Sequence, residues 1–130
     1  MTSVAGIRAP VTSTQLASAF GTSLTGPQAA TNGQPTLLYR QPNSSTPLVV
    51  SVSIYTPQIL AQRGTTPAEF YSQYDDPTAE HVSGIGQKAV VVQDSIIVLT
   101  KHDDVLIVAA NQQVRESQLK DAASKAASKL

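Results

Sequence analysis

The sequence contains no cysteine, and only 14% of its 130 residues are charged. Without cysteine the chain can form neither a disulfide framework nor a thiolate metal site. Nine basic residues balance nine acidic ones, so we expect no basic surface for nucleic acid, no acidic tail and no polybasic anchor. The apolar runs are long enough for strands but too short to span a membrane, and no transmembrane segment is predicted.

The start of the chain lacks the charged region followed by an apolar one that marks a signal peptide. We therefore expect either a cytoplasmic protein or an exported one whose leader lies outside this sequence. Residues 1–11 show no periodicity and are predicted to be an N-terminal tail. The rest, 12–130, is predicted to be a single domain, large enough to bury one core.

The strongest structural signal lies in residues 84–110. Three runs rich in β-branched residues, at 87–93, 96–101 and 105–110, are separated by short polar breaks. This pattern predicts an antiparallel meander. The second and third runs are apolar at almost every position, which is typical of strands that are covered on both faces.

A hairpin is predicted upstream of the meander, with strands at 36–40 and 48–55. The second of these strands alternates, with apolar side chains on one face and Ser51, Ser53 and Tyr55 on the other. Such alternation is typical of a strand that has one face against the core and the other against solvent or a thin cover.

Capping residues and apolar spacing predict four helices. They run from Thr12 to Gly21 and over residues 57–63, 67–74 and 114–129, with a loop at 22–35. The last helix carries an alanine-rich stripe and is predicted to pack across the sheet. The predicted fold class is α+β, an antiparallel sheet of five to six strands, a hairpin plus a meander, with helices packed on it.

Short motifs spread over residues 12–130 carry a resemblance to a known family. They are Ser18-Ala19-Phe20-Gly21, Leu38-Tyr39-Arg40, Val50-Ser51-Val52-Ser53-Ile54-Tyr55, Val82-Ser83-Gly84-Ile85-Gly86-Gln87-Lys88-Ala89, and Leu99-Thr100-Lys101-His102-Asp103 with Val105-Leu106-Ile107-Val108. With these motifs the chain resembles small exported lipoprotein and sensor-type domains of actinobacteria and related bacteria, a family of unknown function with a Mog1/PsbP-like fold. The resemblance implies an extracytoplasmic location. The family's cysteine near Tyr39 and its lipid-carrying N-terminal cysteine are both missing here, and a cytoplasmic location stays as the alternative.

Asp75, Asp76, Glu80 and His81 form the densest run of oxygen and imidazole groups. Four such groups could hold a divalent cation. The alternative, which we prefer, is that Asp75-Asp76-Pro77 ends a helix and His81 is an ordinary strand residue. The segment Gly84-Ile85-Gly86 lacks the third glycine of a phosphate loop and precedes a strand, so we interpret it as a tight corner.

The predicted ligand-binding residues are Ser51, Ser53 and Tyr55, together with Tyr71 and Tyr74 from the helices that follow. Hydroxyl groups beside an aromatic edge are typical of a binding site, although a plain solvated face has the same composition. The preferred hypothesis is a non-catalytic extracytoplasmic binding or sensing domain for an unknown small molecule or protein, with no catalytic residue and no cofactor. The alternatives are a metal-dependent hydrolase using Asp75, Asp76 and His81, and a homo-oligomeric scaffold that pairs through an apolar face.

Overall fold

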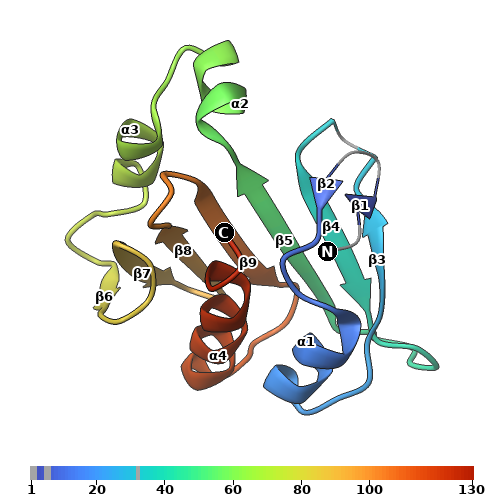
Figure 1. Ribbon diagram of the computed structural model, residues 1–130. Helices are drawn as coiled ribbons and strands as arrows, with labels where there is room; N and C mark the ends of the chain where they lie inside the picture. Colours follow the sequence, from blue (N-terminus) through green and yellow to red (C-terminus); the bar gives the residue numbers. More distant parts are fainter. Residues whose placement is uncertain (1–2, 5–6, 32) are drawn as a thin grey trace.

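The computed structural model of the chain describes residues 3–4, 7–31 and 33–130 (Figure 1). It confirms an α+β fold built on an antiparallel sheet. The sheet has seven strands in the order β3-β4-β5-β9-β8-β7-β6. The strands are β3 (Thr25–Ala29), β4 (Thr36–Arg40), β5 (Val49–Tyr55), β6 (Glu80–Val82), β7 (Lys88–Val92), β8 (Ser95–Leu99) and β9 (Val105–Ala110), and the helices are α1 (Ser13–Phe20), α2 (Pro57–Gln62), α3 (Pro67–Ser72) and α4 (Glu116–Ala127).

The front face of the sheet is covered by α1 and α4, which lie side by side in Figure 1. Strand alternation turns Val52, Val108 and Val98 toward this face, where they join the main core. From α4, the predicted stripe of Leu119, Ala122, Ala123 and Ala126 packs down on them, and all four residues are buried. The small alanine side chains let the helix backbone approach the strands closely, so the prediction that α4 packs across the sheet is confirmed.

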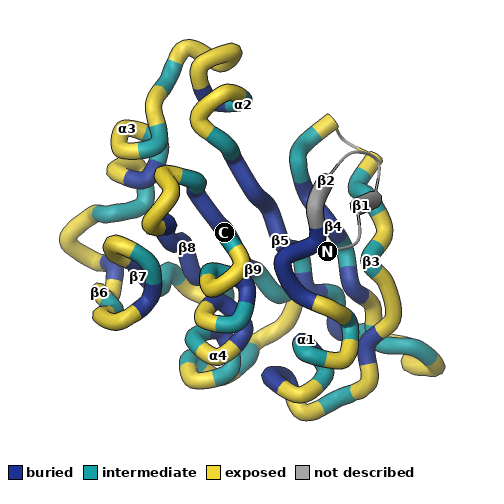
Figure 2. Tube along the Cα trace, viewed as in Figure 1, coloured by how far each residue is buried: buried dark blue, intermediate teal, exposed yellow. Residues whose placement is uncertain are grey.

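The rear face is covered by α2 and α3 only where it carries Tyr55 and Val105. Tyr71 of α3 and Leu60 of α2 are fully buried there, in a second and smaller apolar cluster. Farther along the same face, Ser51, Ile107 and Ala109 are only half-buried. Figure 2 colours the chain by burial and shows half-buried stretches, in teal, among the buried ones of the sheet. We expected helices or loops to cover both faces of these strands. Both faces of β8 are covered, but the rear face of β9 is partly open, because two short helices are too small to cover the whole rear face of the sheet.

The predicted extent of the N-terminal tail is wrong. The tail does not extend to residue 11, because Ala9, Pro10 and Val11 are buried and the Val11 carbonyl accepts a hydrogen bond from the Tyr39 hydroxyl at 2.7 Å. Ahead of them, β1 (Ser3–Val4) pairs with β2 (Ile7–Arg8), while residues 1–2 and 5–6 of the predicted tail lie outside the described residues.

The predicted loop at 22–35 contains an additional strand, β3, and this strand brings the count to seven rather than five or six. Its sequence, Thr-Gly-Pro-Gln-Ala, has none of the apolar alternation that marks a strand. It is held at the sheet edge by backbone pairing with β4, with a register shift between Thr25 and Gln28. Edge strands bury little, so their composition carries little signal.

The helix starts follow their predicted caps. Thr12 and Gln15 form a reciprocal capping box, with the Thr12 N–H donating to Gln15 Oε1 at 2.9 Å and the Gln15 N–H donating to Thr12 Oγ1 at 3.1 Å. Thr56 and Thr66 cap α2 and α3 without a reciprocal bond: the Thr56 hydroxyl accepts the Ile59 N–H and the Thr66 hydroxyl accepts the Glu69 N–H, both at 3.2 Å, and each threonine is followed by proline. None of the helices in the described ranges is both long and apolar enough to cross a membrane.

Candidate functional site

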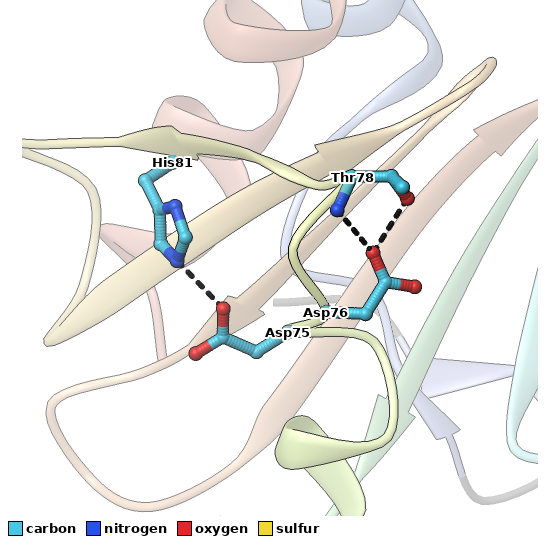
Figure 3. Close-up of polar contacts among 4 residues, drawn as sticks. All are labelled: Asp75, Asp76, Thr78 and His81. Carbon is cyan, nitrogen blue, oxygen red and sulfur yellow. Dashed lines mark hydrogen bonds and ion pairs between the residues drawn. The ribbon is translucent and has the colours of Figure 1, made fainter.

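The four acidic and imidazole residues that could have held a cation do not converge. Figure 3 shows His81 pointing toward Asp75, whereas Asp76 turns to Thr78. Strand β6 turns Glu80 toward the front face and His81 toward the rear, because successive side chains on a strand point to opposite sides. His81 Nε2 lies 2.6 Å from Asp75 Oδ1, and the His81 side chain is 67% exposed. Of the four candidate ligands, Asp75 and His81 contact each other at this exposed position, and the other two do not join them.

The other two members of the run have partners of their own. Asp76 Oδ1 accepts hydrogen bonds from the Thr78 N–H at 2.8 Å and from the Thr78 hydroxyl at 2.6 Å, and these bonds hold the pKa of Asp76 below its usual value. Glu80 meets Glu116 of α4; the hydrogen bond that the Glu80 carboxyl group donates to the Glu116 carboxylate, together with the charge of Glu116, raises the pKa of Glu80 and lowers that of Glu116. Within residues 3–4, 7–31 and 33–130, no group of three or more His, Asp or Glu side chains is placed to hold a metal ion.

The glycine corner, Gly84-Ile85-Gly86, packs against the turn that joins β8 to β9. The Gln87 N–H donates to the Leu99 carbonyl at 2.8 Å, and the Gln87 side-chain amide donates to the Thr100 carbonyl and to Asp103 Oδ1, both at 2.8 Å. Asp103 adopts a positive φ of 63°, as expected for an Asp in a tight turn. These hydrogen bonds join the end of the glycine corner to the β8–β9 turn. They agree with the interpretation of the glycines as a tight corner.

The five residues of the predicted binding face all come from the rear side of the molecule, but they do not form one surface. Ser53, Ser51 and the three tyrosines have different surroundings. Ser53 is buried and its hydroxyl lies 2.8 Å from that of Thr36 on β4. Ser51 is half-buried, beyond the part of the face that the helices cover. Neither serine is among the described residues that line the hollow between α2 and the β3–β4 loop.

The tyrosines of this set mostly pack against other side chains of the protein. Tyr55 and Tyr74 both contact Phe70, with ring centroids 4.7 and 5.8 Å apart respectively. Burial, and to a smaller extent Tyr55, raises the pKa of Tyr74. Tyr71 is fully buried under Lys88, whose Nζ lies 5.1 Å from the centre of the ring. The Tyr55 hydroxyl donates a hydrogen bond to Gln34, and Gln34 lines a surface hollow.

That hollow lies between α2 and the loop that joins β3 to β4, and its volume is about 410 Å³. Its centre is Gln34, whose Oε1 accepts a hydrogen bond from Arg63 Nη1 at 2.8 Å and one from the Tyr55 hydroxyl at 3.3 Å. The Arg63 guanidinium also lies 5.3 Å from the centre of the Tyr55 ring. We call this site the Arg63 hollow. The residues that line it are Ala29, Ala30, Gly33, Gln34, Pro35, Ile59, Gln62 and Arg63.

Sequence reasoning located Tyr55 but missed Gln34 and Arg63. Gln34 falls in the segment 22–35, which the sequence predicts to be a loop, and Arg63 follows the last residue of α2. The two residues are 29 positions apart in the sequence. No local pattern connects them, because their contact depends on where the β3–β4 loop lies relative to α2.

Neither a protein-family model, nor a curated protein, nor a solved structure matches this chain.

Tyr71→Phe is expected to leave the free energy of unfolding unchanged or to raise it by up to about 1 kcal/mol. Within the described part of the chain, the buried Tyr71 hydroxyl has no hydrogen-bond partner, and burial together with the charge of Asp75 raises its pKa to about 12. Removing the hydroxyl relieves a buried polar group and keeps the ring. Urea denaturation followed by circular dichroism measures the change.

Tyr39→Phe is the matched control, since Tyr39 is equally buried and burial raises its pKa to about 12 as well. Its hydroxyl donates to the Val11 carbonyl at 2.7 Å, so its removal leaves a buried acceptor unpaired and should lower the free energy of unfolding by about 1–3 kcal/mol. Equal losses for the two variants would show that the Tyr71 hydroxyl has a partner after all.

Proposed function

We propose that this chain is a non-catalytic binding or sensing domain that takes a small molecule in the Arg63 hollow. The observation that carries the proposal is the convergence of a guanidinium, an amide and a phenol beside a concave surface of about 410 Å³. Ligand sites in proteins combine mostly apolar walls with a few polar groups that converge, and their volumes begin near this size. The hollow has such walls in Ala29, Ala30, Pro35 and Ile59.

The topology and the location in this proposal are supported by the sequence resemblance. The motifs that resemble the exported lipoprotein and sensor-type domains support a Mog1/PsbP-like topology and an extracytoplasmic location. Detection of the protein in envelope or secreted fractions, rather than in the cytoplasmic one, would test the location. The hydrolase alternative has only the Asp75–His81 pair to support it, and a single exposed pair supplies too few ligands for a metal centre.

The proposal predicts where small molecules bind. In a fragment screen monitored by ¹⁵N-resolved NMR, we expect chemical-shift changes to cluster at the amides of Ala30, Gln34, Ile59 and Arg63, because these residues line or border the hollow. Ala30→Trp fills the hollow and should abolish the changes.

Ala68→Trp is the control, since Ala68 lies exposed on α3 and does not line the hollow. It should leave fragment binding unchanged. Shift changes confined to Asp75 and His81 would move the site and favour the hydrolase alternative. Changes along Ser51, Ile107 and Ala109 that grow with protein concentration would instead favour pairing of two copies.

A further inference from the structure

We infer that the ligand of the Arg63 hollow carries a single carboxylate on an otherwise apolar body, and that Arg63 is the residue that binds the carboxylate. This inference rests on the proposed function and adds to it the chemical class of the ligand.

Arg63 is fixed in position before any ligand binds. Its guanidinium lies over the Tyr55 ring at 5.3 Å from the ring centre, and its Nη1 donates to Gln34 Oε1 at 2.8 Å. The Tyr55 hydroxyl donates to the same amide oxygen at 3.3 Å. Stacking and one hydrogen bond restrict a side chain that would otherwise lose much rotamer entropy on binding. The guanidinium is therefore pre-organised at the hollow.

The positive charge of Arg63 is not neutralised by the protein. The ion pairs within the described ranges are His81–Asp75, Lys120–Glu116 and Lys125–Asp121, and none of them includes Arg63. Among the described residues that line the hollow there is no Asp or Glu. A guanidinium has five N–H donors in a planar fork, and the neutral Gln34 oxygen takes only one of them in the bonds that we observe. The remaining fork matches the two oxygens of a carboxylate.

The walls of the hollow decide between a carboxylate and a phosphate. Of the lining residues that the structure describes, Arg63 is the one that is basic, so a phosphate group with nearly two negative charges would keep an unbalanced charge. Ala29, Ala30, Pro35 and Ile59 provide apolar contact for the rest of the ligand. One cation beside an apolar wall favours a monocarboxylate, such as an aromatic or aliphatic acid, over a phosphorylated metabolite.

The test uses benzoate as the probe, with benzamide as its neutral counterpart of the same shape and inorganic phosphate as the competing anion. Each compound is titrated into ¹⁵N-labelled full-length protein at constant ionic strength, and Kd is measured from the amides of Ala30 and Ile59. We expect benzoate to bind at least tenfold more tightly than benzamide, and phosphate to cause no saturable change.

Variants assign the effect to Arg63. Arg63→Gln should raise the Kd for benzoate at least tenfold and leave that for benzamide unchanged, whereas Arg63→Lys should retain part of the preference, since lysine keeps the charge but not the fork. Arg40→Gln is the matched control. Arg40 is exposed on β4 outside the hollow, so its replacement removes the same charge and should change neither Kd.

The outcomes separate this inference from the proposed function. If benzamide binds as tightly as benzoate and Ala30→Trp blocks both, the hollow is a binding site and the carboxylate inference is overturned. Saturable binding of phosphate that depends on Arg63 also overturns it, in favour of a phosphorylated ligand. If no compound of the fragment screen perturbs the hollow, the proposed function fails and the inference fails with it.

Discussion

Val98→Asp is expected to leave no cooperatively folded protein. Val98 lies on β8 near the middle of the sheet, faces α4 and is fully buried. An ionised carboxylate at this position would have no partner, and burying it costs several kcal/mol even when the group takes up a proton instead. The total stability of a domain of this size is about 5–15 kcal/mol, so this single change removes most of it. Urea titration followed by circular dichroism and by the dispersion of NMR resonances measures the outcome.

Ile107→Asp is the informative comparison, because Ile107 sits on the neighbouring strand β9 and pairs with Ile97. The apolar sequence of β9 predicts the same collapse at this position. In the structure, however, Ile107 faces the rear side and is only half-buried, so the carboxylate that the substitution introduces can reach water. We expect a folded variant with a loss of about 1–3 kcal/mol. A cooperative unfolding transition for Val98→Asp would show that α4 does not seal the front face.

Much of the fold could be predicted because local signals and burial agree. The apolar runs of β7, β8 and β9, the alternation of β5 and the threonine caps of α1, α2 and α3 all specify the elements that the structure contains. The exceptions are the segments that are stabilised by contacts distant in sequence. Val11 is buried because Tyr39 reaches it from β4, and β3 is a strand because β4 offers it backbone partners.

The candidate site was harder to predict for the same physical reason. Closeness in sequence made Asp75, Asp76, Glu80 and His81 candidate ligands for one cation, although we preferred a helix end and an ordinary strand residue. The alternation of β6 sends Glu80 and His81 to opposite faces. The Arg63 hollow shows the reverse case, in which Gln34 and Arg63 are distant in sequence and meet in space. A single sequence specifies each element better than it specifies the loop contacts between elements, and this site is made of such contacts.

Gly86→Ala is expected to lower the free energy of unfolding by on the order of 3 kcal/mol, and Gly84→Ala by only about 1 kcal/mol. Both glycines have positive φ, 60° at Gly86 and 86° at Gly84, so both alanine variants bear the cost of a left-handed backbone. The environments differ. A methyl group at Gly86 would lie 2.6 Å from the Leu99 carbonyl oxygen and 2.8 Å from Val98 Cγ1, whereas one at Gly84 would meet nothing within 4 Å.

The larger loss at Gly86 is expected because the two groups beside it are held in place by other contacts. The Leu99 carbonyl accepts the Gln87 N–H at 2.8 Å, and Val98 is packed beneath α4, so neither can move away without breaking a contact of the core. Urea denaturation of the two variants under the same conditions gives the difference directly. Equal losses would mean that backbone conformation alone requires these glycines. A larger loss at Gly86 would show that close packing of the corner against β8 requires a glycine there, with no bound phosphate needed to explain either residue.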